Sequence, residues 1–398
     1  MSTSIRNISV AIDGTKSSGF CIELDGTRWR LDNFMLSQSL LSPNTLSFSL
    51  HKEPDERINE VSFNVCGAII GKEVLISLET ESVEKESLKA DTDSVADIEF
   101  AGVIIGASGS RNRSEFSVNV EACSWDALLN DNPTCKSFEN LTLNDIVNDV
   151  VDDYSEHLKT DVDARFTNTI PYCVQYNESN YQFLQRLARR YGEWLYNDGK
   201  KMVFGNLPKG ESVKLAYPSQ DVPSYNVDLK MRHVAFNHVA SSYNSYDANE
   251  KEGIEEMQRE YNTLSEQVFQ ASQSCFVKPT LQNLHSGGFA DSDGRETVLN
   301  VSTKTQARGE KASMLTYSGT TYCSKLKIGS KLVIEDNYMP DASALEKSKV
   351  EQDEMLITEL VHYFSADETY SNHFVGIPSA CDYPPYSDSD IYPVAQSC

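Results

Sequence analysis

The 398-residue chain lacks the features that mark several well-defined protein classes. It contains no Cys-x-x-Cys pair, and its nine cysteines lie far apart, at positions 21, 66, 123, 135, 173, 275, 323, 381 and 398. An odd number of cysteines at such wide spacing does not fit a disulfide framework or a zinc site. We therefore expect free thiols in a reducing compartment.

Basic residues and long apolar runs are also scarce. The chain has 35 Lys and Arg against 59 Asp and Glu, which gives a formal net charge of −24. Such a surface repels nucleic acid and anionic membranes, so neither is expected as a partner. No apolar run approaches the length of about 20 residues that spans a bilayer, and the opening MSTSIRNISVAIDG predicts no signal peptide.

Motifs that carry catalysis or ligand binding are missing as well. The nearest approach to a Gly-x-Ser-x-Gly nucleophile elbow is residues 106–110, which lack the final glycine and read as a hairpin turn. No phosphate-binding glycine loop occurs. On a strand, His233 and His238 would face opposite ways, and no cysteine or carboxylate cluster accompanies His362 and His373. The sequence predicts no catalytic residue, no metal and no cofactor.

What the sequence does contain is a series of short alternating strands interrupted by helices. The pattern predicts an α+β chain that is mainly β, with two related antiparallel β-barrels and an intervening helical segment. The expected parts are a first barrel over 1–125, a helical segment over 126–203 that ends in a β-hairpin, a second barrel over 204–378 with a helical insertion at about 248–295, and a proline-rich linker over 379–398.

An internal repeat supports two related barrels. IGKEVLISL at 70–78 matches IGSKLVIED at 328–336 when the chain is shifted by 258 positions. The same shift, kept without a gap, aligns strands over more than fifty residues and predicts a duplicated unit. Three such chains would present six similar units, and a ring of this kind can stack on a six-fold partner.

Two helices are expected with distinct roles. Ser179 and Gln182 have the spacing of a capping box, Gly192 can end the helix, and Asp198-Gly199 predicts a two-residue hairpin turn. A second, polar helix over 252–274 carries one narrow apolar stripe, which we interpret as a candidate subunit contact. The residues of this stripe are Met257, Tyr261, Leu264 and Val268.

The stretch at 176–205 also resembles a family signature. Its phrase YNES-x-x-x-FL-x-RLA, followed by Gly and an aromatic hairpin, resembles VgrG, the spike protein of type VI secretion systems, and is similar to the hubs of contractile phage tails. The ending YSNHFVGIPSAC at 370–381 looks like the family's as well. The signature residues are Tyr176, Asn177, Glu178, Ser179, Phe183, Leu184, Arg186, Leu187, Ala188 and Gly192.

This resemblance implies a structural protein and not an enzyme. It implies a homotrimer that forms the base of a spike and caps a hexameric inner tube of Hcp-like subunits, with effector or baseplate proteins as further partners. Such a protein stays in the cytoplasm until the machine assembles and ejects it. Family members usually continue into an oligonucleotide/oligosaccharide-binding-type barrel and a needle, and this chain stops at Cys398.

Three alternatives remain open at this point. The chain could be a short phage-tail hub of the late-control type, a cell-wall hydrolase associated with a spike, or an adhesin-like binding module with two β domains. Acidic pairs such as Glu255-Glu256 could serve a hydrolase, although 59 acidic residues make chance adjacency common. The sequence does not distinguish the secretion or phage system, the tube partner or the cargo.

Overall fold

A computed structural model shows how these segments fold. It describes residues 3–52, 63–80, 97–111, 115–207, 212–217, 222–232, 236–240, 249–252, 261–276, 280–283, 307–336, 350–351, 353–367 and 369–386. The predicted fold class, α+β and mainly antiparallel β, is confirmed. No helix in these described stretches is long and apolar enough to cross a membrane.

The N-terminal part, called unit 1 here, consists of long antiparallel strands and one short helix. Its elements are β1 (Thr3–Ile12), β2 (Thr15–Lys16), β3 (Cys21–Leu24), β4 (Thr27–Ser39), β5 (Thr45–Lys52), α1 (Asn64–Ile69), β6 (Glu73–Thr80), β7 (Ile98–Arg111) and β8 (Phe116–Ser124). Alternate side chains of these strands fill one core. The segment 106–110, expected to be a turn, is the end of β7 and pairs with β8.

The middle segment contains helices, the predicted hairpin at its end, and further strands that the sequence did not predict. Its elements are η1 (Trp125–Asn130), β9 (Thr134–Leu141), α2 (Leu143–Val151), η2 (Asp152–Tyr154), β10 (Thr160–Asp163), β11 (Ile170–Glu178), α3 (Asn180–Tyr191), β12 (Trp194–Asn197) and β13 (Met202–Gly205). The helix predicted from the capping box is present as α3. In β9 and β10 only Phe138 is buried, so these strands lack the alternation that would have revealed them.

The C-terminal part, unit 2, again consists of strands, with an insertion that holds one helix. Its elements are β14 (Ser212–Tyr217), β15 (Ser224–Leu229), β16 (Phe236–Ala240), β17 (Asn249–Glu252), α5 (Thr263–Cys275), β18 (Thr280–Asn283), β19 (Leu315–Thr321), β20 (Lys331–Asp336), β21 (Val350–Glu351), β22 (Met355–Phe364) and β23 (Thr369–Pro378). The helix expected over 252–274 begins at Thr263, after an Asn262 cap, and residues 253–260 lie outside the described part.

A hydrogen-bonded turn recurs in the two units. In unit 1 the Gly71 amide donates to the Ile104 carbonyl at 2.8 Å, and in unit 2 the Gly329 amide donates to the Ile357 carbonyl at 2.9 Å. The Ile104 amide in turn donates to the Lys72 carbonyl at 3.0 Å, and the Ile357 amide donates to the Ser330 carbonyl at 2.9 Å. Both glycines have positive φ, 77° and 82°. The turn before β6 is therefore repeated before β20.

The repeat continues into the next two strands, but not in the gapless register that the sequence suggested. A β-bulge follows Ile104 in β7 and Ile357 in β22, and these residues stand 253 positions apart instead of 258. Their partners Ala122 and Gly376 stand 254 apart. The prediction of one uniform shift is wrong, because Ile104 follows Gly71 by 33 positions, whereas Ile357 follows Gly329 by 28.

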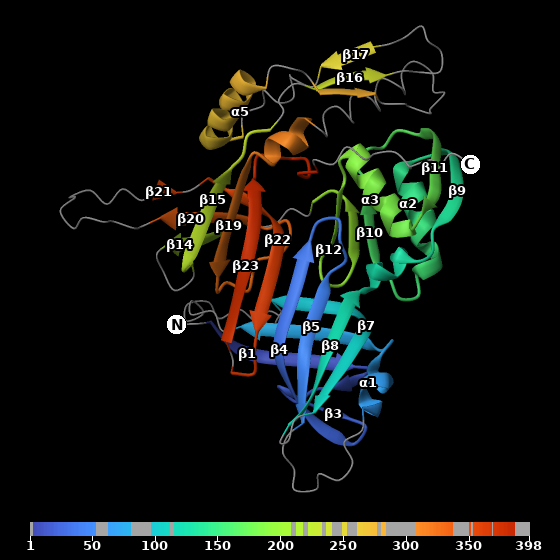
Figure 1. The fold of residues 1–398 in the computed structure, drawn as a ribbon, viewed down its shortest axis with the longest axis vertical. Helices are drawn as coiled ribbons and strands as arrows, with labels where there is room; N and C mark the ends of the chain where they lie inside the picture. The colour runs from blue at the N-terminus through green and yellow to red at the C-terminus, as the bar shows by residue number, and fades with distance from the viewer. Residues whose placement is uncertain are drawn as a thin grey trace, which may run out of the picture.

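The two units share one sheet. Strand β22 pairs with β4, and β23 pairs with β1, so that fifteen strands belong to a single sheet. Strands β22 and β23 also pair with each other. The hydrogen-bonded path therefore runs from β4 through β5, β8, β7, β6, β1, β23 and β22 and returns to β4. Two separately closed barrels are not what the described residues form. In Figure 1 the strands of unit 1 lie below those of unit 2, with α2 and α3 at one side.

Candidate functional site

The signature segment begins where β11 passes into α3. Asn177 occupies a β-bulge at the end of β11 with a φ of 49°, a conformation that Asn tolerates better than most residues. The Ser179 hydroxyl oxygen accepts a hydrogen bond from the backbone amide of Gln182, and the Gln182 side-chain oxygen accepts one from the backbone amide of Ser179. The predicted capping box is therefore confirmed. Gly192 ends α3 with a left-handed φ of 69°, as expected. Tyr176 lies exposed on β11.

A nearly buried ion pair joins the strand to the helix. The Arg186 Nη2 atom lies 2.6 Å from Glu178 Oε1 and donates to the Val174 carbonyl at 2.6 Å. The guanidinium also stacks 5.0 Å from the ring centre of Phe183. The remaining signature residues, Leu184, Leu187 and Ala188, are buried in the core of the middle segment. Apart from the exposed Tyr176, these residues cap the helix, join it to the strand or fill the core.

A second charged pair lies at the other end of α3. The buried Glu193 carboxylate accepts from the amides of Arg165 and Phe166 at 3.1 and 2.9 Å. Burial raises the pKa of Glu193, although the two amide bonds counteract part of that rise. The Arg165 guanidinium donates to the Gly192 carbonyl and, at 2.6 Å, to the Asp382 carbonyl. Arg165 therefore connects the helix end to the last described residues of the chain.

Those last residues dock against both neighbouring parts. The guanidinium groups of Arg165 and Arg308 both lie over the Tyr383 ring, 4.3 and 4.6 Å from its centre. Arg308 also pairs with the Asp382 carboxylate at 3.0 Å. The buried Tyr386 hydroxyl accepts from the Leu195 amide at 3.2 Å. This stretch belongs to the proline-rich linker predicted over 379–398, and its described residues 381–386, called the clasp here, contact the middle segment and unit 2.

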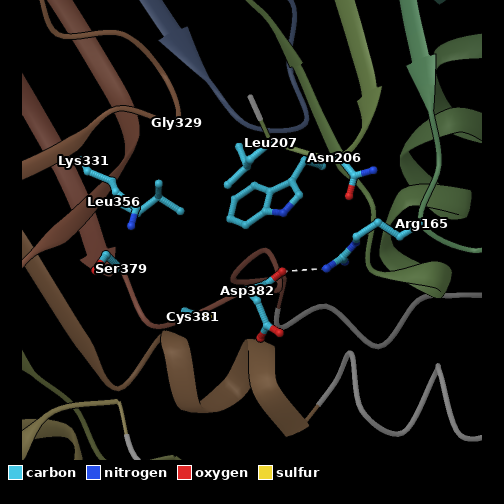
Figure 2. Close-up of a pocket in the computed structure, with 10 residues that line it drawn as sticks. Arg165, Asn206, Leu207, Gly329, Lys331, Leu356, Ser379, Cys381 and Asp382 are labelled. Carbon is cyan, nitrogen blue, oxygen red and sulfur yellow. Dashed lines mark hydrogen bonds between the residues drawn. The ribbon is translucent and has the colours of Figure 1, made fainter. Parts of the chain in front are cut away.

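A cavity of about 530 Å³ lies under this clasp (Figure 2). Its walls come from the middle segment, from the repeated turn of unit 2 and from the clasp. The lining residues are Arg165, Trp194, Asn206, Leu207, Gly329, Lys331, Leu356, Ser379, Cys381 and Asp382. The Cys381 thiol donates to the Tyr383 carbonyl at 3.0 Å, and burial raises its pKa to about 11. A thiol held in its protonated form is a poor nucleophile.

Cationic groups in the cavity wall are already paired. Lys331 lies 3.1 Å from Glu354, whose carboxylate also accepts from Ser379 at 2.8 Å. These ion pairs and hydrogen bonds hold the middle segment, unit 2 and the clasp together. Sequence reasoning missed Arg165, Arg308 and the clasp, and the signal for them was the presence of three tyrosines in the proline-rich end of the sequence.

The described residues of the apolar stripe predicted as a subunit contact pack against other residues of the same chain. Tyr261 and Leu264 pack in the core of unit 2, and Val268 packs beside Phe269. Met257 lies outside the described residues. The buried Lys311 ammonium lies 2.6 Å from Glu266 and fixes α5 to the rest of unit 2. A subunit contact by this stripe stays a prediction.

The histidines show no shared ligand geometry. His362 is buried and contacts Tyr370 and Gln38, with its Nδ1 atom 2.8 Å from the Tyr370 hydroxyl. His373 is exposed on the adjacent strand, and His233 lies outside the described part. Among the residues placed by the structure, no group of three or more His, Cys, Asp or Glu side chains could hold a metal ion.

Two related strand units joined by a clamped helical segment define a modular β scaffold, in which charged pairs hold the parts together. A model of the phage tail baseplate hub (GPD) family matches residues 60–368, more than three quarters of the sequence. The chain belongs to this family, which is one of structural tail hubs and not of enzymes. None of the curated proteins matches it.

Solved structures with the same fold come from tails and from a secretion machine. The tail protein from Neisseria meningitidis MC58 matches with a TM-score of 0.62 at 9% identity, covering 95% of this chain and 98% of that chain. The 43 kDa tail protein of prophage MuSo2 from Shewanella oneidensis gives 0.58 at 13%, covering 94% and 99%. The E. coli c3393 protein, described as a type VI secretion component similar to T4 tail proteins gp27 and gp5, gives 0.53 at 14%, covering 95% and 79%.

Proposed function

We propose that three copies of this chain form a ring that caps the end of a hexameric inner tube in a contractile injection machine. The observation that carries the proposal is the repeated turn and bulge, which give each chain two related units. A three-fold ring of such chains presents six related units and can match the symmetry of a hexamer by repeated contacts. Membership of a baseplate hub family supports the same role.

Two machines could contain such a ring. The signature phrase and the similarity to c3393 favour the base of a type VI spike of the VgrG kind, with an Hcp-like tube as partner. The family match favours a phage-tail hub, with a tail-tube protein as partner. In either machine the chain would stay in the cytoplasm until assembly, and effector or baseplate proteins would be further partners of the ring.

Electron microscopy of the purified full chain tests the ring. We expect particles with three-fold symmetry and six lobes, and sedimentation at the mass of a trimer. A uniformly monomeric protein at micromolar concentration, with added tube protein failing to bind, would refute the proposal. Parallel binding assays with an Hcp-type protein and with a phage tail-tube protein would distinguish the two machines.

A further inference from the structure

Strand β15 of unit 2 takes the place that β4 holds in unit 1. In unit 1, β4 pairs with β5 and β5 with β8, and in unit 2, β15 pairs with β19 and β19 with β23. The residue before the bulge leads, from one paired residue to the next, to Leu36 in unit 1 and to Val227 in unit 2, so these two residues correspond. Leu36 lies opposite Leu46, and Val227 lies opposite Tyr317.

The two equivalent strands differ in what covers their outer edge. Leu36 is 1% exposed, whereas Val227 is 37% exposed. Two positions further on, Gln38 is 6% exposed and its counterpart Leu229 is 46% exposed. The reason is that β22 pairs with β4, while β15 ends the hydrogen-bonded path through the described strands. An exposed apolar edge strand of this kind can add a strand from another chain.

Strand β7 of unit 1 is the counterpart of β22, the strand whose edge pairs with β4. On one side, β22 pairs with β23, and on the other it pairs with β20 before the bulge and with β4 over Glu359–Phe364. Strand β7 likewise pairs with β8 on one side and with β6 up to Val103 on the other. Beyond its bulge, Gly106–Arg111 has no partner on that second side among the described residues.

We propose that β15 of one copy pairs antiparallel with the Gly106–Arg111 edge of β7 in the next copy. The proposal rests on the three-fold ring proposed above and specifies how neighbouring copies join. Transferring the β4–β22 register places Asn226 opposite Ser110, Val227 opposite Gly109 and Leu229 opposite Ala107. Val227 and Leu229 of β15 thus lie opposite residues with little or no side chain, and the Phe63 ring already covers one face of Gly109.

This pairing repeats, between copies, the contact that already joins the two units within one chain. It is a head-to-tail contact, because β15 and β7 are different surfaces, and head-to-tail contacts close into rings when the rotation allows it. Each chain supplies one β15 edge and one β7 edge. Three copies would then make three contacts within chains and three equivalent contacts between chains.

Cysteine cross-linking of the full chain tests the register. The S110C/N226C variant places two cysteines directly opposite on neighbouring copies, where the separation of about 4.5–5.5 Å between Cα atoms permits a disulfide. We expect covalent dimers and trimers under mild oxidation. The slipped pair S108C/N226C and each single variant should give little product. M35C/Y363C, the equivalent exposed pair within one chain, is the positive control and should close without changing the mass.

The outcomes separate this inference from the proposed function. If microscopy shows a six-lobed ring but S110C/N226C gives no more cross-linked product than S108C/N226C, the β15–β7 pairing is wrong and the ring stands. If no ring and no cross-link form while the M35C/Y363C disulfide closes, both proposals are overturned. Predominant trimer from S110C/N226C alone supports the pairing.

Discussion

The repeated turn has the same backbone in both units but different surroundings. Ile70 before Gly71 is 50% exposed, whereas Ile328 before Gly329 is 5% exposed. In unit 2 the side chain belongs to a core that includes Trp194 of the middle segment. The two units therefore share a hydrogen-bonded pattern, and the part of the chain that packs on each unit decides whether the isoleucine side chain is buried.

Truncating the docked aromatic should show this difference most strongly. Trp194→Ala removes a buried side chain at the junction of the middle segment and unit 2. We expect a loss of about 3–5 kcal/mol in the free energy of unfolding, because the cavity adds to the lost transfer energy. Chemical denaturation measures it.

The matched variant in unit 1 is Ile70→Ala. Its side chain is half exposed, so the expected change is within about 0.5 kcal/mol. A loss for Ile70→Ala as large as that for Trp194→Ala would show that Ile70 is covered as Ile328 is, and would break the comparison.

Burial by a neighbouring strand should also make stability depend on pH. His362 is covered by β4, and burial lowers its pKa to about 3. Below the unfolded pKa of about 6.5 the unfolded chain binds a proton that the folded chain does not, so stability falls as pH falls from about 6.5 towards 3. At pH 5 this amounts to about 2 kcal/mol.

The His362→Gln variant tests this dependence, because it retains hydrogen-bonding atoms and removes the titration. Unfolding curves at pH 7 and pH 5 should differ less for this variant than for the unmodified protein. His373→Gln, an exposed change on the adjacent strand, is the control. If both variants keep the full pH dependence, another group is responsible.

The clasp should contribute less than the buried aromatic. Tyr383→Ala removes a ring that stacks on Arg165 and Arg308. Cation–π contacts contribute about 0.5–2 kcal/mol each, so a total loss of about 2 kcal/mol is expected in the free energy of unfolding. Tyr383→Phe keeps the ring and should retain most of the stability. A loss as large in Phe as in Ala would exclude stacking as the cause.

Features that depend on residues close together in the sequence could be predicted, whereas features that depend on residues far apart in the sequence could not. The cap at Ser179 depends on Gln182, three positions away, and was visible in the sequence. The clasp was not, because Tyr383 depends on Arg165, more than two hundred positions earlier. Likewise, Asp198-Gly199 predicted a two-residue turn, but the loop runs over 198–201, since Asn197 pairs with Met202.

Long-range contact also explains that longer loop. The Asp198 carboxylate accepts from the amides of Lys200 and Lys201, and the Gly199 carbonyl accepts from the Ala101 amide at 2.7 Å. Gly199 has a φ of 107°, and a Cβ there would lie 2.2 Å from the Glu99 carbonyl oxygen. The glycine is needed because the loop tip lies directly on β7, which no local pattern shows.

The smallest effect on stability should accompany the clearest effect on association. Leu229→Lys places a charge on the exposed edge of β15, a substitution that blocks strand addition. Because the lysine stem can cover the same apolar surface, the free energy of unfolding should change by about 1 kcal/mol or less. Sedimentation should nevertheless shift from trimer to monomer.

Tyr363→Lys is the matched control for that variant. Tyr363 is similarly exposed, but it lies on β22, whose edge is already paired with β4. Its lysine variant should therefore remain a trimer. If Leu229→Lys also stays trimeric, neighbouring copies do not use the β15 edge, and the two units differ in burial for a reason other than the assembly of the ring.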